Sequence, residues 1–168
     1  MAKLSDPITI LKGVGPTRAK QFAQLGIFTL EDLICHFPRA YEDRTRILTI
    51  SQLEADTPAC FRAMGMSTPR TSHIRKGLCL ARVQVADHTG RLNLTFFNSR
   101  FAAENLEYGA EYVFYGSISG DYSGYGMTNP VFEPVHSAGV TTRRVLPIYP
   151  LTAGLTNGVV QKAVAQAL

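Results

Sequence analysis

The chain has 168 residues, of which 45% are hydrophobic and 18% are charged, and its formal net charge is +4. This composition allows a buried core and argues against a disordered chain. No apolar run approaches the roughly 20 residues of a membrane span, and the N-terminus lacks a signal-peptide core. Cys35, Cys60 and Cys79 are odd in number and lack CxxC spacing, which argues against a disulfide framework and a structural zinc site. We therefore expect a cytoplasmic protein with one or two compact domains.

Charge is distributed unevenly along the chain. Residues 57–100, called the basic block below, hold seven basic side chains and one acidic side chain. Residues 101–136 hold five acidic side chains and no Lys or Arg. A surface without a binding role usually intersperses its charges, so the basic block predicts an electropositive face for a polyanion.

Short helices are predicted over the first 38 residues. Asp6 before Pro7 has the pattern of an N-cap followed by proline at the first helical position. Pro16 begins a second helix, and Gly26 is placed as its C′ residue. Thr29 then caps a third helix.

From about residue 57 the apolar pattern has period two, which is typical of strands. The predicted strands are residues 59–66, 77–87, 91–98, 111–119 and 126–134. A short helix at residues 101–108 separates the third strand from the fourth, and Asp87–Gly90 forms a hairpin turn in which Gly90 takes a left-handed conformation. Five strands with a helix between the third and fourth have the order of an OB-fold barrel.

The sequence thus predicts an α+β protein with three segments. Residues 1–56 contain a helical hairpin, residues 57–136 form a five-stranded antiparallel OB-fold barrel, and residues 137–168 form a linker and the start of a helix. That last helix begins near Asn157 and has no cap at Leu168, so we expect the chain to be a piece of a longer protein.

Signatures of catalysis are missing. Residues 13–20 are not a Walker A loop, because Ala19 stands where a glycine must precede the lysine. There is no HExxH or GxSxG, and the four histidines lack metal-ligand spacing. We expect no catalytic residue, no metal site and no cofactor within these residues.

The segment from Leu11 to Leu33 has a helix-hairpin-helix pattern. Its glycines would expose backbone N–H groups at a helix N-terminus, where a phosphate oxygen can bind. Gly13, Gly15 and Lys12 are therefore candidate phosphate contacts. A hairpin that only packs against its neighbour fits the same residues, and the sequence leaves both interpretations open.

The third strand carries the sharpest signal. Alternation places Leu92, Leu94 and Phe96 inside the barrel and Phe97 on a polar, basic outer face. OB-folds bind single strands by stacking bases on aromatic rings within a basic groove, so Phe97 is a candidate stacking residue. In the alternative interpretation, the following helix covers Phe97. The candidate phosphate contacts are Arg75, Lys76, Arg82, Arg91 and Arg100.

Several motifs, in order along the chain, resemble the N-terminal region of RecG-type DNA helicases. They are Leu11–Gly15, Leu25-Gly26-Ile27 with Asp32-Leu33, Pro38-Arg39 with Tyr41–Arg44, Asp87–Gly90, Phe96-Phe97-Asn98 and Ile148–Leu155. The resemblance implies a wedge domain, which is an OB-fold that docks on a branched DNA junction and splits its strands. It also implies that aromatic residues of the Phe97 block stack on bases at the branch point.

The second aromatic residue of that family is usually a tyrosine four residues after the first. This chain has Phe101 there, which can stack but cannot donate a hydrogen bond, and Ser99 replaces an amide residue. The resemblance implies that ATP and magnesium bind a motor beyond Leu168. The full-length protein would then be an ATP-dependent helicase of replication forks and Holliday junctions in repair and recombination, and this chain would be inactive alone.

The implied partners are branched DNA and the absent helicase domains of the same chain, with no membrane and with a monomeric state. A different class stays open. The barrel could serve as a protein-interaction adaptor whose basic block meets an acidic partner, without direct DNA binding.

Overall fold

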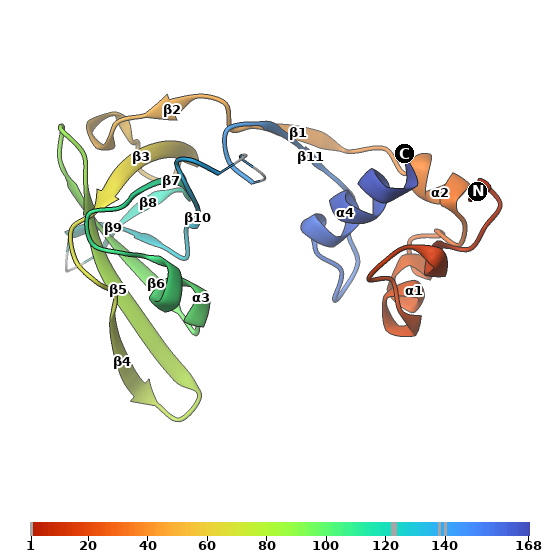
Figure 1. Cartoon of the computed structure of the whole chain (residues 1–168), viewed down its shortest axis with the longest axis horizontal. Coiled ribbons are helices and arrows are strands. Elements are labelled where there is room, and N and C mark those ends of the chain that lie inside the picture. The colour runs from red at the N-terminus through yellow and green to blue at the C-terminus, as the bar shows by residue number, and fades with distance from the viewer. Residues whose placement is uncertain (1, 122–123, 138, 140) are drawn as a thin grey trace. The chain divides into compact units, whose positions relative to one another are not determined.

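The computed structural model describes residues 2–121, 124–137, 139 and 141–168. The chain divides into two compact units (Figure 1). The helical unit comprises Met1–Glu42 with Leu146–Leu168, and the barrel unit comprises Asp43–Val145. Residues 43–56 therefore lie in the barrel unit, and the last helix lies in the helical unit.

The helical unit contains a 3₁₀ helix and three α-helices. They are η1 (Ile8–Ile10), α1 (Pro16–Ala23), α2 (Leu30–Ile34) and α4 (Asn157–Ala167). Phe22, Leu33 and Val160 are fully buried in its core. Val160 and Ala163 of the last helix, whose start near Asn157 is confirmed, are buried in this core.

Two of the predicted helix ends are confirmed by their hydrogen bonds. After α1, the N–H of Gly26 donates to Ala23 O and the N–H of Ile27 donates to Phe22 O, while Gly26 has a φ of +75°. These bonds form a Schellman motif with Gly26 at C′. At the start of α2, Thr29 and Asp32 form a reciprocal capping box.

The predicted cap at Asp6 is wrong. The first helical turn is the short η1, which begins after Pro7, and the side chain of Asp6 accepts a hydrogen bond from Lys3 N instead. The carbonyl of Asp6 accepts a hydrogen bond from Leu30 N at the start of α2. The backbone at Asp6 is therefore held by α2 and does not cap a helix that follows it.

Most strands belong to the barrel unit. One pair, β1 (Ala40–Asp43) and β11 (Val145–Ile148), forms a separate two-stranded sheet. The barrel itself contains β2 (Ile47–Leu48), η2 (Ile50–Gln52), β3 (Ala59–Gly65), β4 (Arg70–Arg75), β5 (Leu78–Ala86), β6 (Arg91–Phe97), α3 (Arg100–Asn105), β7 (Glu111–Gly116), β8 (Ile118–Asp121), β9 (Gly124–Thr128) and β10 (Val131–Pro134).

Among the described residues, the main sheet has the order β10-β7-β3-β5-β6-β9-β8, with β2 on β3 and β4 on β5. The α+β class and the OB-fold are confirmed, but β6–β9 and β2–β3 pair in parallel. The last two predicted strands are each divided in two. Asn129, with a φ of +47°, and Pro130 separate β9 from β10, because neither favours a continuous strand.

The predicted inner face of β6 is confirmed. Leu92, Leu94 and Phe96 are at most 4% exposed and pack with Phe61 and Phe114 in the barrel core. Alternation with period two therefore places the intervening residues of β6 on the outside.

The turn between β5 and β6 differs from the prediction in one respect. Gly90 does not take the left-handed conformation. Instead, the Asp87 carboxylate accepts hydrogen bonds from Thr89 N, Thr89 Oγ1 and Gly90 N at 2.6–3.0 Å. A side chain that satisfies these donors holds the turn without positive φ at the glycine.

Candidate nucleic-acid interface

The outer face of β5 and β6 brings much of the basic block together. Strand register places Arg82 opposite Arg70 of β4 and opposite Thr95 of β6, and Thr95 lies opposite Thr128 of β9. Directly opposed residues share one face of a sheet. This polar row across four strands contains two exposed arginines, of which sequence reasoning missed Arg70.

Phe97 lies at the end of β6 on the same outer face. Its side chain is 41% exposed, so the following helix does not cover it. The N–H of Phe97 donates to Asn129 Oδ1 at 2.8 Å, and the next residue, Asn98, has a φ of +51° and accepts from Cys79 N at 2.8 Å. Asn98, which the sequence marked only as part of a motif, and Asn129, which it did not mark, thus fix the backbone on both sides of the exposed ring.

Phe101 lies in α3 and is 60% exposed. Ser99 caps this helix by accepting from Ala102 N, and Ala102 is fully buried in the barrel core. The ring of Phe101 lies 5.2 Å from that of Phe132, measured between centroids. One side of Phe101 is therefore supported by the core while much of the ring stays open to solvent.

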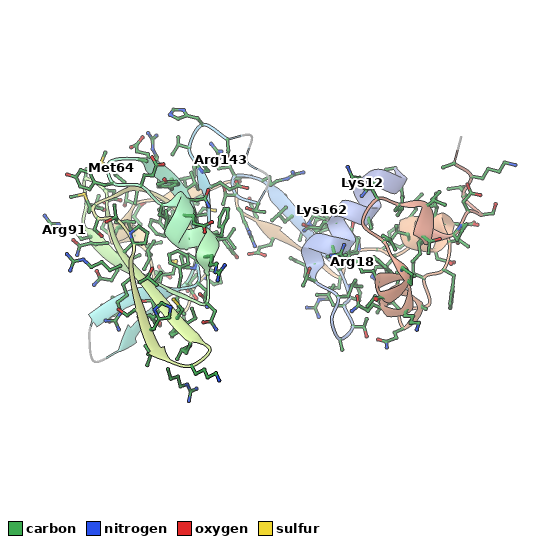
Figure 2. The ribbon with its side chains drawn as sticks, turned by 60° about the horizontal axis from the view of Figure 1, so that its bottom comes forward. Lys12, Arg18, Met64, Arg91, Arg143 and Lys162 are labelled. Carbon is green, nitrogen blue, oxygen red and sulfur yellow. The ribbon has the colours of Figure 1, made fainter. Side chains whose placement is uncertain are left out.

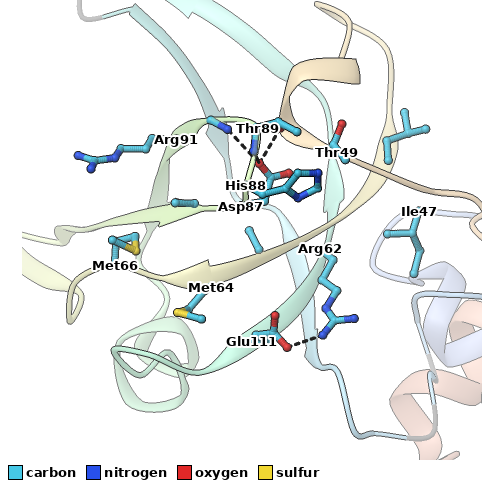
Figure 3. Close-up of a pocket in the computed structure, with 14 residues that line it drawn as sticks. Ile47, Thr49, Arg62, Met64, Met66, Asp87, His88, Thr89, Arg91 and Glu111 are labelled. Atoms are coloured by element: carbon cyan, nitrogen blue, oxygen red, sulfur yellow. Dashed lines mark hydrogen bonds and ion pairs between the residues drawn. The ribbon is translucent and has the colours of Figure 1, made fainter.

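Arg91 lies at the opposite end of β6 from Phe97, about 20 Å away at 3.3 Å per residue. Its exposed side chain extends from the barrel unit and points away from Asp87 (Figures 2 and 3). Arg91 and Phe97 therefore cannot touch the same nucleotide, and they mark the two ends of an extended surface.

A groove of about 880 Å³ lies beside the Arg91 end of β6 (Figure 3). Arg62 on β3 forms an ion pair there with Glu111 on β7. Partial burial raises the pKa of Asp87, but hydrogen bonds from Thr89, Ile50 and Gly90 outweigh it and hold that pKa below its usual range. The two carboxylates of this groove, Asp87 and Glu111, thus already have partners within the protein.

The remaining candidate cations of the barrel unit lie at two places. Arg75 ends β4 and Lys76 follows it, at the tip of a hairpin that extends beyond the other strands (Figure 1). Arg100 begins α3 and lines a second cavity together with His73 of β4. The structure therefore distributes the predicted phosphate contacts over the sheet face, the hairpin tip and α3.

The candidate contacts Lys12, Gly13 and Gly15 lie in the helical unit. Gly13 has a φ of +89°, and its carbonyl accepts from Arg18 Nη1. The N–H and the carbonyl of Lys12 both bond to the side chain of Gln166 on α4, so only the Lys12 side chain extends freely (Figure 2). These residues form a turn of the helical unit that Gln166 on α4 fixes.

Other site types find no support in the described part of the chain. No group of three or more His, Cys, Asp or Glu side chains there could hold a metal ion. No disulfide bond joins Cys35, Cys60 or Cys79. Among the described helices, none is long and apolar enough to cross a membrane.

Comparison with known proteins supplies the family context. A family model described as RecG wedge domain matches residues 7–168. The chain is 29% identical over 166 residues to the ATP-dependent DNA helicase RecG of Pasteurella multocida (strain Pm70), covering 96% of this chain and 23% of that protein. It is 34% identical over 163 residues to the protein of the same name from Thermotoga maritima, covering 95% of this chain and 20% of that protein.

A solved structure gives the same picture. The structure described as RecG bound to a three-way DNA junction matches with a TM-score of 0.86 and 30% sequence identity, over 99% of this chain and 23% of that one. The chain thus spans less than a quarter of the length of these relatives.

Proposed function

The chain belongs to the RecG wedge domain family, and on that premise we propose that it binds branched DNA and holds the strands apart where they separate. The relative of known structure is described as bound to a three-way DNA junction. The observation that carries the proposal for this chain is the 41% exposure of Phe97 beside the polar row of Arg70 and Arg82.

The chemistry of this surface suits exposed bases. A base stacked on an aromatic ring contributes roughly 1–3 kcal/mol, and every base offers a face for stacking. Phe97 and Phe101 would stack on bases that lose their neighbours at the branch point. This stacking offsets some of the free energy that is lost when the bases at the branch point unstack from their neighbours. The two strands therefore separate more easily.

Phosphates would bind around these rings. Arg82 on the sheet face, Arg91 at the far end of β6 and Arg100 on α3 provide cations along the DNA, and Arg75 and Lys76 provide them at the hairpin tip. Such contacts position a strand without reading its sequence. The surface therefore suits a junction of any sequence.

The work of strand separation belongs to the longer protein in this proposal. The chain spans 23% of the RecG of Pasteurella multocida, whose name describes an ATP-dependent DNA helicase. ATP and magnesium would bind outside these 168 residues, and the chain by itself would bind DNA without hydrolysing ATP. Forks and Holliday junctions are the substrates we propose for the whole protein in repair and recombination.

The test is a titration of the chain with a forked DNA and with a plain duplex of equal length. We expect tighter binding to the fork, because only the fork offers unstacked bases to Phe97. Phe97→Ala should weaken fork binding by roughly 5- to 150-fold, in line with the loss of one stacked base. Binding to the duplex should change little.

A matched control is Phe37→Ala, because Phe37 is an exposed phenylalanine of the helical unit. This variant should keep the fork preference. Equal binding of the wild-type chain to fork and duplex would contradict the proposal. If the wild-type chain binds neither fork nor duplex but binds a protein partner, the result would favour the protein-interaction adaptor instead.

A further inference from the structure

A second cavity, of about 570 Å³, lies between the β4–β5 hairpin and the start of α3. Thr71 and His73 of β4 and Cys79 and Ala81 of β5 form the hairpin side, since Thr71 lies opposite Ala81 and His73 opposite Cys79. Asn98, Ser99, Arg100 and Glu104 form the other side, and Gly77 and Leu78 complete the lining. Pockets of 300–1,000 Å³ bury most of a drug-sized ligand, so this cavity has room for one nucleobase.

The position of the cavity connects it to the stacking residues. Its lining residues Asn98, Ser99 and Arg100 are the three residues between Phe97 and Phe101. Hydrogen bonds fix this connection, because Asn98 bonds to Cys79 on the hairpin and Ser99 bonds to Ala102 in α3. The cavity residues Cys79 and Ala81 lie on the face of β5 opposite to Arg82 and Phe97, so this connection leads from the outer face of the sheet to the opening.

The lining offers both donors and acceptors. The side chain of Asn98 accepts from Cys79 N, and its amide NH₂ donates to none of the described residues. Arg100 adds further donors, while Glu104 adds a carboxylate, and neither forms an ion pair within the part of the chain that the structure describes. Recognition of a base edge needs such a mixture of donors and acceptors.

A phosphate fits this cavity poorly. The Glu104 carboxylate would repel an anion, and Leu78, Cys79 and Ala81 present little charge to it. A flat base can place its faces against such residues and its polar edge against Asn98, Glu104 and those N–H donors of Arg100 that a neighbouring phosphate leaves open. We propose that this cavity receives one unpaired nucleobase of a branched DNA, beside the connection between Phe97 and Phe101. This inference rests on the proposed function and adds a subsite to it.

The experiment fills the cavity. Thr71→Phe places a large ring in it from an exposed position on an edge strand, where phenylalanine favours strand structure. Ile74→Phe is the matched control, because Ile74 lies on the same strand, is 58% exposed and does not line the cavity. Each protein is titrated with forks that carry an abasic site at one unpaired position at a time.

At one position next to the branch, we expect the abasic site to weaken wild-type binding by roughly tenfold, as expected for the lost hydrogen bonds of one base. Thr71→Phe should bind the intact fork roughly tenfold more weakly and lose its sensitivity at that position. Ile74→Phe should behave as wild type. Unchanged affinity and sensitivity in Thr71→Phe, or equal losses for forks and duplex, would overturn the inference.

A second variant covers the case in which Thr71→Phe does not fold. Glu104→Ala, on the exposed side of α3, should change the preference among the four bases at the sensitive position. If Glu104→Ala instead binds forks with each of the four bases more tightly by the same factor, the inference is contradicted. Such a result would show only the loss of a charge that repels DNA. If the wild-type chain prefers forks and these variants behave like it, the base subsite fails while the proposed function stands.

Discussion

The carboxylate of Glu133 holds the loop that follows β10. Its two oxygens accept four hydrogen bonds at 2.6–3.2 Å, from the N–H and Oγ1 groups of Thr141 and Thr142. Thr142 is fully buried, and Arg143, with a φ of +60°, donates to the carbonyls of Val135 and Ser137. Partial burial raises the pKa of Glu133, but the hydrogen bonds from both threonines outweigh it and lower that pKa.

Glu133→Gln should therefore reduce the free energy of unfolding at neutral pH by about 1–3 kcal/mol, because an amide cannot accept from all four donors. The pKa of this group is lower in the folded state than its ordinary value of 4.5, so its contribution is complete above that value. The contribution is lost as the pH falls through the folded-state pKa. Denaturant unfolding across this acidic range should show a shallower loss of stability in the variant than in wild type.

Glu104→Gln is the control for this prediction, because Glu104 is an exposed carboxylate of α3 whose side chain bonds to none of the described residues. It should leave both the stability and its pH dependence nearly unchanged. A Glu133→Gln variant as stable as wild type at neutral pH would show that the loop is held by Arg143 and backbone contacts alone.

Among the elements, the β4–β5 hairpin combines exposure with positive charge. All six residues of β4 are exposed, and residues 67–82 contain four basic and no acidic side chains. Arg75 and Lys76 lie at its tip, where Gly77 turns the chain with a φ of +83°. An exposed edge strand with such charges is protected from pairing with other strands, and it also suits a phosphate backbone.

If both tip residues contact phosphates of a duplex arm, the double variant Arg75→Ala/Lys76→Ala should reduce the slope of log affinity against log salt by about 1.8. Fork binding over a range of salt concentrations measures this slope. Lys3→Ala/Arg46→Ala removes the same charge from exposed positions outside the basic block, and its slope should match wild type. Equal reductions in both variants would assign the effect to net charge rather than to the hairpin.

The elements also show what the sequence could predict. The strand β6 alternates apolar and polar residues, so its position, its inner face and the exposure of Phe97 were predictable and are confirmed. The strand β4 was missed because both of its faces are exposed and no alternation marks it. Arg70 was missed for the same reason, since its place beside Arg82 depends on the pairing of β4 with β5.

The hydrogen bond that holds the backbone of Phe97 could not be predicted from the sequence, for another reason. Asn129 is 32 residues away in sequence and reaches Phe97 only because β9 pairs in parallel with β6. Likewise, the Asp87 side chain replaces the glycine conformation that the turn pattern suggested. The roles of Phe97 and Phe101 in stacking stay predictions.

Over the whole molecule, the net charge of +4 is a sum over charged side chains that have different structural roles. Arg62 of the basic block is paired with Glu111, whereas Arg70 and Arg82 lie on an exposed sheet face. The acidic stretch of residues 101–136 also has a structural role, since Glu133 accepts hydrogen bonds from Thr141 and Thr142 in the loop after β10. The barrel unit therefore carries the proposed recognition of branched DNA, and the helical unit raises a separate question.

That question is whether the turn at Lys12 contacts DNA or only packs against α4. Lys12→Ala should keep the turn, because Gln166 bonds to the backbone of residue 12 and not to its side chain. If the turn binds a phosphate, affinity for fork and duplex should fall by the same factor, and the salt slope for duplex should decrease by about 0.9. The fork preference should persist, because a phosphate contact does not sense the branch.

Titrations of fork and duplex at several salt concentrations measure both quantities, with Lys3→Ala as the control for the loss of one exposed charge. An unchanged slope in Lys12→Ala would show that the turn serves only to pack the helical unit. A loss confined to the fork would place this turn at the branch point, and recognition of the branch could then no longer be assigned to the barrel unit alone.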